Sequence, residues 1–448
     1  MDPTASLETG QDTPRSVEKA WYLVLAFEAT HPRAAAQRLA LDGLTEVSIG
    51  RGTERSVARD GARLRLDLDD RFQSKDHFLL KRSGAGWRLE DVESKNGTRR
   101  RGERTRAAEL EDGDVIEAGA SFFVMRETAA RVSDLALAPE PRDTLRTLHA
   151  ALGAELELLS RIAPSRLPIL VRGESGTGKE VAARSIHALS KRRGPLIAVN
   201  CGALPPALAE AELFGARRGA YSGAVEDRPG LVRTAEHGTL FLDEIADLSL
   251  PAQAALLRVL QEKEVRALGA HHTAKVDVRV IAATHRDLEA MVARETFRHD
   301  LAARLRGHVL ELPALRDRRE DLGVLCAELL LQLSSADGPP RALDRSAARA
   351  VFAHAWPGNV RELDHALRFA AARTHAEIAL DDLPDTVRAP GEGDAEPSPP
   401  AVDQRARILA LIAEHGGNLS AVARALHTSR SQVHRLLERH GIELKPGS

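Results

Sequence analysis

The sequence has very little cysteine, since Cys201 and Cys326 are the only two among 448 residues. Two isolated cysteines exclude a disulfide framework and a cysteine-rich zinc site. Aromatic residues make up only 3% of the chain, and no apolar stretch approaches the roughly 20 residues that a membrane-spanning helix needs. The first twenty residues contain acids and no apolar core, which argues against a secretory signal. We therefore expect a soluble, cytoplasmic protein with no membrane partner.

Net charge is nearly absent as well. The chain has 63 basic and 65 acidic residues and a formal net charge of −2, so any basic surface must be local. Its 448 residues exceed what one hydrophobic core supports and suggest about two to four domains. Residues 1–18 are polar without periodicity and are expected to form a disordered tail. Stretches 129–143 and 389–402 are expected to be linkers.

A glycine-rich stretch organises the rest of the chain. It follows the apolar run 167–171 and precedes residues 181–187, which have helical spacing. A strand, a glycine loop and a helix in this order predict a phosphate-binding loop, whose backbone N–H groups hold phosphate oxygens. Lys179 is expected to reach the outer phosphates, whereas Glu180 stands where a Ser or Thr usually contacts Mg²⁺. The nucleotide-binding loop consists of Gly173, Glu174, Ser175, Gly176, Thr177, Gly178, Lys179 and Glu180.

Two carboxylates end a later apolar run. The short run 238–242 is followed by Asp243 and Glu244, a pattern typical of a buried parallel strand that ends at a site. Asp243 can hold Mg²⁺ as a metal ligand, and Glu244 can orient or deprotonate an attacking water. Behind a phosphate-binding loop, this pair indicates an enzyme that hydrolyses a nucleoside triphosphate.

Apolar runs alternate with helical patterns around these motifs. The runs cover residues 167–171, 196–200, 238–242, 276–284 and 308–312. Such alternation predicts an α/β fold with a parallel sheet and helices on both faces. Residues 319–388 have mainly helical patterns and are expected to form a smaller α-helical lid.

Residues 20–126 have a different pattern, with short alternating runs separated by turns. This pattern predicts a small all-β sandwich. Three loop clusters lie within it, namely Gly50-Arg51-Gly52, Ser74-Lys75-Asp76-His77 and Ser94-Lys95-Asn96-Gly97-Thr98. Together with residues 110–116, the clusters resemble the forkhead-associated (FHA) domain, whose loops bind phosphothreonine peptides.

The FHA resemblance implies a role for each loop residue. Arg51, Ser74 and Lys75 would bind the phosphate, and Asn96 would hold the peptide backbone. A guanidinium, a hydroxyl and an ammonium suit a doubly charged group. His77 would brace the loops. The expected partner is a phosphothreonine-containing protein, and the alternative is a sandwich that serves only as a spacer or a generic interaction domain.

Residues 144–388 resemble the AAA+ ATPase domain of bacterial sigma-54-dependent transcriptional activators. The glycine loop, with Glu180 in place, is similar to that family's own version. After residues 212–215 comes a segment that resembles the family's sigma-54-contacting loop, with Tyr-Ser where relatives usually have Phe-Thr. The segment consists of Gly219, Ala220, Tyr221, Ser222, Gly223 and Ala224. The resemblance implies ATP and Mg²⁺ as cofactors and sigma-54 RNA polymerase holoenzyme as a partner.

Residues at the ends of the predicted strands also match the family. Asn200 takes the place of the asparagine that pairs with the catalytic glutamate, here Glu244. Thr284 and His285 fall at the first nucleotide sensor, where many relatives have Thr-Asn. An imidazole can donate one hydrogen bond at that position.

Three arginines match positions that act on the nucleotide. Arg361, within residues 356–363, corresponds to the second sensor. Arg298 and Arg304 correspond to two arginine fingers. Because such a finger acts on a neighbouring subunit, a homo-oligomer follows, and in this family it is typically a hexameric ring.

The C-terminal residues contain three helical patterns. Residues 405–414, 420–426 and 429–440 are separated by short breaks, and Ser429 is a suitable N-cap for the third. They resemble the Fis-type helix-turn-helix that closes sigma-54 activators and binds double-stranded upstream DNA. Seven Lys/Arg against four Asp/Glu between residues 403 and 445 give a local positive excess. The DNA-binding residues implied are Arg430, Ser431, Gln432, His434 and Arg435. The alternative is a small helical dimerisation domain.

The sequence is thus identified as a multidomain member of the sigma-54 activator family. We expect an all-β FHA domain at 19–128, an α/β AAA+ P-loop domain with an α-helical lid at 144–388, and an all-α helix-turn-helix at 403–448. No receiver domain is apparent, so aspartyl phosphorelay is not the expected input. The alternative function is a DNA-bound phosphoprotein adaptor whose ATPase assembles complexes without engaging sigma-54.

Overall fold

The computed structural model describes residues 19–140, 144–220, 225–334, 341–374 and 377–388. Internal contacts divide the chain into one unit of residues 1–390 and a second of residues 391–448. The expected N-terminal tail, the linker 389–402 and the helix-turn-helix with its predicted DNA-binding residues lie outside the described residues, as do Tyr221, Ser222, Gly223 and Ala224. Among the helices that are described, none has the length and apolar character needed to cross a bilayer.

The N-terminal part folds into two packed β-sheets, as its alternating runs predicted, and we call residues 19–140 the sandwich domain. The sheets have strand orders β13-β2-β1-β12-β11-β8-β9 and β10-β7-β6-β3-β5-β4. The strands are β1 Ala20–Glu28, β2 Ala36–Ala40, β3 Glu46–Arg51, β4 Ser56–Asp60, β5 Arg63–Leu68, β6 Phe78–Ser83, β7 Gly86–Asp91, β8 Thr98–Arg100, β9 Glu103–Thr105, β10 Ala107–Leu110, β11 Val115–Ala118, β12 Ser121–Thr128 and β13 Leu135–Leu137.

Strand direction gathers the predicted loop clusters at one edge of the second sheet. Strands β3 and β5 run parallel, and β7 has the same direction because β6 is antiparallel to both β3 and β7. The ends of these three strands therefore lie together. Arg51 is the last residue of β3, and the loops after β5 and β7 contain Ser74 and Asn96, so three segments distant in sequence meet at one end of the sandwich.

The second part of the fold is a parallel five-stranded sheet, and all five predicted runs are confirmed as its strands. The strand order is β15-β16-β19-β14-β20, with β14 Ile169–Arg172, β15 Leu196–Asn200, β16 Thr239–Asp243, β19 Arg279–Thr284 and β20 His308–Glu311. The accompanying helices are α1 Ala150–Ile162, α2 Lys179–Ser190, α3 Ala209–Phe214, α4 Leu231–Thr234, α5 Leu250–Glu262, α6 Leu288–Ala293 and α7 His299–Leu305. A small hairpin pairs β17 Glu264–Val265 with β18 Ala274–Lys275. We call residues 144–312 the P-loop domain.

The lid, residues 315–388, is helical as expected. Its helices are α8 Leu322–Leu333, α9 Arg345–Ala353, α10 Asn359–Arg373 and α11 Asp385–Arg388, and its short strands are β21 Ala342–Leu343 and β22 Glu377–Ile378. Trp356 is fully buried and its indole N–H donates to the carbonyl of Val351 at 2.9 Å. This contact fixes the turn that leads into α10, the lid helix whose first residues contact the glycine loop.

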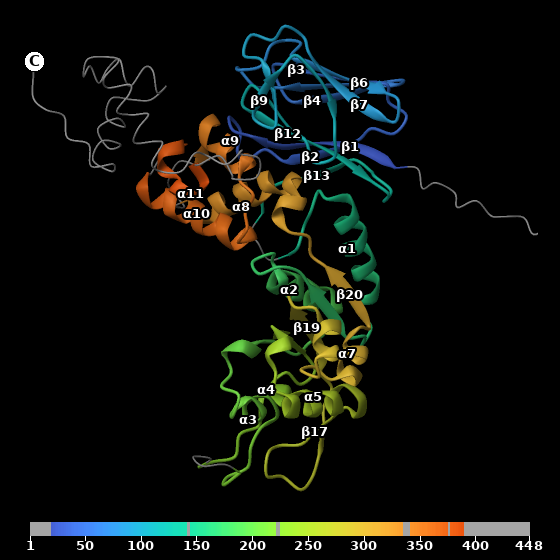
Figure 1. The fold of residues 1–448 in the computed structure, drawn as a ribbon, viewed down its shortest axis with the longest axis vertical. Coiled ribbons are helices and arrows are strands. Elements are labelled where there is room, and N and C mark those ends of the chain that lie inside the picture. Colours follow the sequence, from blue (N-terminus) through green and yellow to red (C-terminus); the bar gives the residue numbers. More distant parts are fainter. Residues whose placement is uncertain (1–18, 141–143, 221–224, 335–340, 375–376, 389–448) are drawn as a thin grey trace, which may run out of the picture. The chain divides into compact units, whose positions relative to one another are not determined.

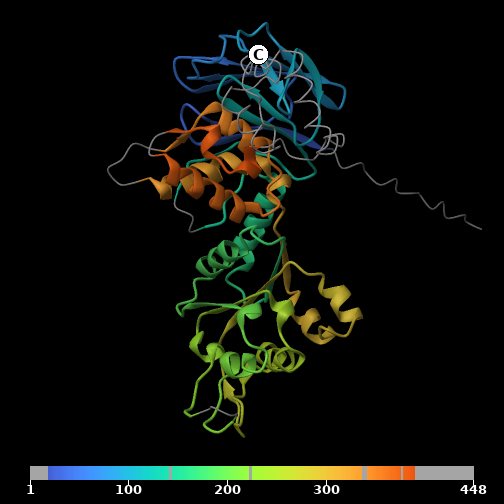
Figure 2. The ribbon, with the colours of Figure 1, turned by 60° about the vertical axis from the view of Figure 1, so that its left-hand side comes forward.

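The sandwich domain and the lid share one hydrophobic core. Strand β1 is buried on both faces, because Leu23 and Leu25 point into the sandwich while Tyr22, Val24 and Ala26 pack with the lid. Across the junction the rings of Phe122 and Phe352 stack with centroids 4.8 Å apart. Both views show the orange lid helices lying against the blue sheet that contains β1 (Figure 1, Figure 2). The two domains are thus packed together rather than only tethered.

Backbone and charged contacts complete this junction. Gly323 in α8 lies so close to β1 that a Cβ there would overlap the carbonyl oxygen of Ala26. Arg349 of α9 donates two hydrogen bonds, of 2.7 and 2.6 Å, to the buried carboxylate of Glu117 in β11. The stretch 129–143, expected as a linker, contains β13, which pairs with β2 because Leu135 and Leu137 extend the sheet. The connection is therefore partly structured.

Candidate functional site

The glycine loop follows β14 and leads directly into α2. Gly178 caps the helix with φ 104°, a left-handed conformation that favours glycine. Gly176 also has positive φ, and a Cβ there would overlap the carbonyl oxygen of Gly358 in the lid. Lys179 is buried, and its Nζ donates to the carbonyls of Gly173 and Glu174 at 3.1 and 3.3 Å. The loop therefore has the strand–loop–helix geometry that the sequence predicted.

A cavity of about 240 Å³ lies beside the loop. Residues from the glycine loop, from the end of β16 and from the lid line it together. They include Ser175, Gly176, Thr177, Gly178, Lys179, Glu180, Asp243, Glu244, Arg318 and Arg361. Most residues predicted for nucleotide binding and for chemistry thus surround one space, at the carboxyl ends of parallel strands where ligands bind in such sheets.

The carboxylate of Glu244 lies between the ammonium group of Lys179 and the imidazole ring of His285. Its carboxylate is 3.3 Å from Nζ of Lys179 and 2.8 Å from Nδ1 of His285. Burial favours the neutral acid, but the charge of Lys179 and the hydrogen bond with His285 outweigh burial and lower the pKa of Glu244. Burial and then the charge of Glu244 raise the pKa of Asp243. Glu244 is therefore the more readily ionised of the two carboxylates.

The residues at the other strand ends take positions that differ in part from the expectation. Thr284 is buried at the end of β19, and its Oγ1 accepts from the backbone N–H of Arg286 at 3.0 Å. The side chain of Asn200 accepts from the backbone N–H of Gly202 at 2.9 Å. The expected pairing of Asn200 with Glu244 is therefore not the arrangement seen here. The side-chain oxygen of Asn200 accepts the backbone N–H of Gly202 instead, and the carboxylate of Glu244 is hydrogen-bonded to His285.

The lid contacts the glycine loop through Arg361, the residue predicted to contact the nucleotide. Its Nη1 donates to Oγ of Ser175 at 2.8 Å, and the N–H of Val360 donates to the carbonyl of Gly176 at 3.0 Å. Sequence reasoning missed Asn359, whose Nδ2 donates to the carboxylate of Glu174 at 3.0 Å and to the carbonyl of Ser175 at 3.1 Å. Asn359 lies within residues 356–363, the segment that resembles the second sensor, but the identity of this one residue does not predict its contact with the glycine loop.

Two further arginines at the beginning of the lid were also missed. Arg316 donates two hydrogen bonds to Glu174, of 2.9 and 2.5 Å, and these bonds followed by the one from Asn359 lower the pKa of Glu174 to about 2. Arg318 is almost fully buried and donates to the carbonyl of Thr177 at 2.6 Å. Glu174 thus joins the glycine loop to the lid, a contact that explains an acidic residue in a phosphate-binding loop.

The two predicted arginine fingers lie away from this cavity. Arg298 caps α7, is exposed and forms a bidentate ion pair with Asp300, with bonds of 3.1 and 2.7 Å. Arg304 is exposed near the end of α7. Neither residue lines the cavity of its own chain. Their positions are compatible with action on another subunit.

The two ends of the predicted sigma-54 loop are joined by backbone bridges and an ion pair, and we call this region the base of the loop. Its described part begins after α3, where Ala216 forms bridges with Arg228 and with Leu268. Arg217 pairs with Asp227 across this base. Gly219 and Ala220 lie on the described arm, and Gly219 has φ +82°. The base thus holds both arms of the loop together.

The predicted phosphopeptide residues come together at the edge of the sandwich. The backbone N–H of Arg51 donates to the carbonyl of Ser74 at 2.9 Å, and Oγ of Ser74 accepts from the N–H of Lys95 at 3.0 Å. Nδ2 of Asn96 donates to the carbonyl of Phe72 at 2.7 Å. Lys75 is exposed on the same loop as Ser74. Three loops therefore hold one another in a fixed arrangement.

His77 braces these loops. It is buried, its Nδ1 accepts from the N–H of Ser74 at 3.1 Å, and its Nε2 lies 3.4 Å from the carbonyl of Gly97. Burial lowers the pKa of His77, which keeps the ring neutral. A neutral imidazole with one acceptor and one donor nitrogen fits both contacts.

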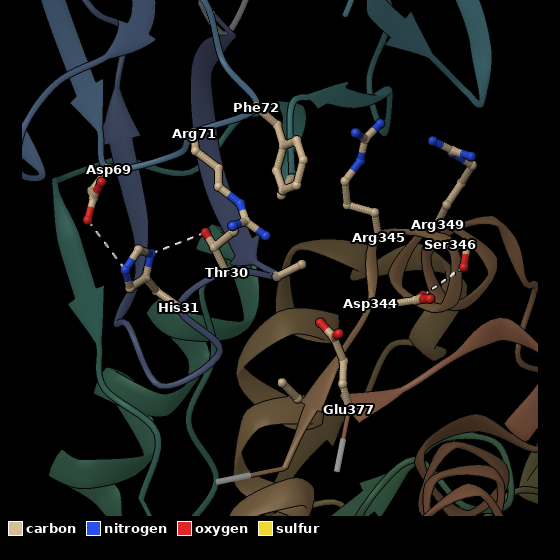
Figure 3. Close-up of a pocket in the computed structure, with 13 residues that line it drawn as sticks. Thr30, His31, Asp69, Arg71, Phe72, Asp344, Arg345, Ser346, Arg349 and Glu377 are labelled. Carbon is tan, nitrogen blue, oxygen red and sulfur yellow. Dashed lines mark hydrogen bonds and ion pairs between the residues drawn. The ribbon is translucent and has the colours of Figure 1, made fainter. Parts of the chain in front are cut away.

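A larger cavity of about 780 Å³ lies between the lid and the loop after β5, the loop that contains Ser74. The ring of Phe72 has the guanidinium of Arg71 at 4.9 Å and that of Arg345, from the lid, at 5.2 Å. Figure 3 shows Phe72 between Arg71 of the sandwich and Arg345 of the lid, with Glu377 of the lid below them. The loop that contains Ser74 is thus in direct contact with the lid.

Four family models match successive parts of the chain. A sigma-54 interaction domain matches residues 146–311, an AAA+ ATPase lid domain 316–399, an FHA domain 47–119, and a homeodomain-like domain 399–444. The last of these supports a helical DNA-binding domain in the region outside the described residues.

Similar proteins cover about two thirds of the chain. Transcriptional regulatory protein GlrR of Escherichia coli (strain K12) is 42% identical over 295 residues, which are 64% of this chain and 66% of GlrR. Regulatory protein AtoC of the same strain is 42% identical over 299 residues, 63% of this chain and 65% of AtoC. The chain therefore spans slightly less than two thirds of these relatives. The crystal structure of NtrX from Brucella abortus in complex with ADP shares 34% identity and a TM-score of 0.51, over 67% of this chain and 70% of NtrX.

Proposed function

The chain belongs to the family of sigma-54-dependent transcriptional activators, and we propose that it hydrolyses ATP to remodel a closed promoter complex of sigma-54 RNA polymerase. The observation that carries this proposal is the single cavity around which Lys179, Asp243, Glu244 and Arg361 converge. The NtrX structure with ADP supports a nucleotide as its ligand.

The geometry supports a separate role for each of these side chains. The N–H groups of the glycine loop and Lys179 would bind the phosphates, and Arg361 would contact them from the lid. Glu244 would accept a proton from the attacking water as a general base. Leu145, Leu325 and Val360 also line the cavity and provide apolar surface for the adenine ring.

Mg²⁺ fits the same cavity. It prefers oxygen ligands and is usually held by one or two carboxylates together with phosphate oxygens. Asp243 supplies such an oxygen donor at the end of β16, where burial and then the charge of Glu244 raise its pKa, and a bound cation would favour its ionised form. When bound, the ion would neutralise charge on the phosphates.

The FHA domain would provide the regulatory input by binding a phosphothreonine protein. Arg51, Ser74, Lys75 and Asn96 lie on loops that contact one another, and His77 keeps those loops in register. A phosphothreonine carries nearly two negative charges, which suit the guanidinium and the ammonium. The helix-turn-helix would hold the protein on DNA upstream of the promoter.

Open-complex formation tests the function directly. Purified chain, sigma-54 holoenzyme and promoter DNA should give ATP-dependent melting of the start site, measured by permanganate reactivity. ATP hydrolysis without any melting, at every nucleotide and phosphopeptide concentration tried, would favour the adaptor function instead.

We predict that the arginine fingers act across a subunit boundary. Arg304→Ala and Lys179→Ala should each be inactive, yet a mixture should recover partial ATPase activity, because some intact Lys179 sites then face an intact Arg304. Coupled ATPase assays on mixed rings measure this recovery. Arg294→Ala, at an exposed arginine at the end of α6, is the matched control and should be active alone. Lack of recovery despite proven mixed assembly would contradict action in trans.

A second prediction concerns the C-terminal DNA-binding residues. Arg430→Ala and Arg435→Ala should each weaken specific DNA binding by about 1–3 kcal/mol, since arginine contacts to bases or phosphates have this strength. Footprints should show half-sites about 34 Å apart if two domains bind as a dimer. Removing residues 401–448 should abolish the footprint. A footprint that persists unchanged would place DNA binding elsewhere in the chain.

A further inference from the structure

Two side chains of the sandwich domain reach the segment that joins the parallel sheet to the lid. The hydroxyl of Tyr22 in β1 donates to the carboxylate of Glu320 at 3.2 Å and accepts from the N–H of Ala150, the first residue of α1, at 3.2 Å. Arg126 in β12 lies 3.1 Å from the same carboxylate and donates to the carbonyl of Asp317 at 2.9 Å. The sandwich therefore contacts both the segment before α8 and the beginning of α1.

The same segment contacts the glycine loop with its other side chains. Arg316 pairs with Glu174, and Arg318 donates to the carbonyl of Thr177. Asp321 accepts from Oγ1 of Thr147 and from the N–H of Leu148, both at 2.7 Å, which ties the segment to the residues before α1. Residues 316–321 thus alternate between contacts to the sandwich and contacts that shape the nucleotide cavity.

The interface around this segment leaves little room for sliding. Glu320 is completely buried, so its carboxylate depends on Tyr22 and Arg126 for compensation. Gly323 abuts the backbone of β1, so the spacing of strand and helix is fixed by main-chain atoms. A buried acid next to a tight backbone contact transmits a displacement of β1 to its neighbours, because packed interiors deform little.

We propose that Tyr22 and Arg126 are positioning residues of the nucleotide site. They hold residues 316–321, and through them Arg316 and Arg318, against the glycine loop, so ATP affinity depends on a docked FHA domain. This inference rests on the proposed ATP-dependent function. It makes the FHA domain a structural part of the ATPase.

Tyr22→Phe in the full chain is the sharpest test, because it removes one hydroxyl and keeps the buried ring. The dissociation constant of a fluorescent ATP analogue should rise about five- to tenfold, the size expected from the net contribution of one hydrogen bond. KM for ATP should rise with it while kcat stays within about twofold, since Asp243 and Glu244 remain in place. Thr45→Val is the matched control, because the Thr45 hydroxyl donates only to Ala62 within the sandwich.

A double-mutant cycle with Arg318→Lys tests the route itself. If Tyr22 acts through residues 316–321, the double variant should bind the analogue no more weakly than Arg318→Lys alone. Additive losses would show that Tyr22 acts independently of Arg318 and would overturn the route. An unchanged affinity of folded Tyr22→Phe, with its melting temperature measured in parallel, would overturn the proposal. Failure of the parent chain to bind the analogue would instead refute the proposed ATPase.

Discussion

Glu244→Gln is expected to bind ATP as tightly as the parent chain but to hydrolyse it at least about 100-fold more slowly. A general base contributes about 10²–10⁴-fold to such reactions, and an amide cannot accept the proton. The amide keeps the size of the side chain and can still contact His285, which lies 2.8 Å from the carboxylate. Steady-state ATPase assays together with binding of a fluorescent ATP analogue separate the two effects.

Two further variants serve as comparisons for Glu244→Gln. Lys179→Ala should lose binding itself, because we expect the buried ammonium to bind the phosphates rather than the attacking water. Glu289→Gln is the matched control, since Glu289 is an exposed carboxylate that pairs with Arg306 and does not line the cavity. Turnover by Glu244→Gln at the parental rate would show that the base has been wrongly assigned.

Arg51→Ala is expected to weaken binding of phosphothreonine peptides by about 100-fold or more. Two charge-assisted hydrogen bonds at about 1.5 kcal/mol each amount to this factor. Arg51 lies at the end of β3, and its side chain is exposed and therefore available for a ligand. Its backbone N–H donates to the carbonyl of Ser74. Fluorescence anisotropy with paired phosphorylated and plain peptides measures the loss.

Arg88→Ala provides the comparison for Arg51→Ala. Arg88 lies on β7 of the same sheet and pairs with Glu109, so its loss removes a charge without touching the loops. Phosphoserine peptides should bind less well than phosphothreonine peptides if a pocket accepts the threonine methyl group. Equal affinity for phosphorylated and plain peptides across a broad library would leave the sandwich as a spacer.

Local patterns predicted the elements and most of the site. Strands β14, β15, β16, β19 and β20 follow from apolar runs, and the glycine loop follows from a motif whose letters are adjacent. Parallel strands then bring Lys179, Asp243 and Thr284 to one edge without further information. The pairing of Asn200 with Glu244 stays a prediction, because it depends on which rotamer each side chain adopts, and in this structure Asn200 bonds to Gly202.

The junction of the sandwich with the lid could not be derived in the same way. It joins residues about 300 positions apart in the chain, such as Tyr22 and Glu320, and no periodicity links them. One signal was present in the sequence. Residues 21–27 are apolar at every position, a run typical of a strand buried on both faces rather than of a half-exposed sandwich strand. That run indicated a second cover for β1 without saying which helix supplies it.

The bare α-carbon of Gly323 limits how freely the FHA domain can be exchanged between proteins. A domain transplanted at the connection near residues 129–143 would have to present a strand whose backbone follows the same path past α8. A foreign sandwich with a different curvature would leave the apolar side of α8 exposed to water, which favours aggregation. Recombination of this input domain therefore requires that the lid helix and the strand be inherited together.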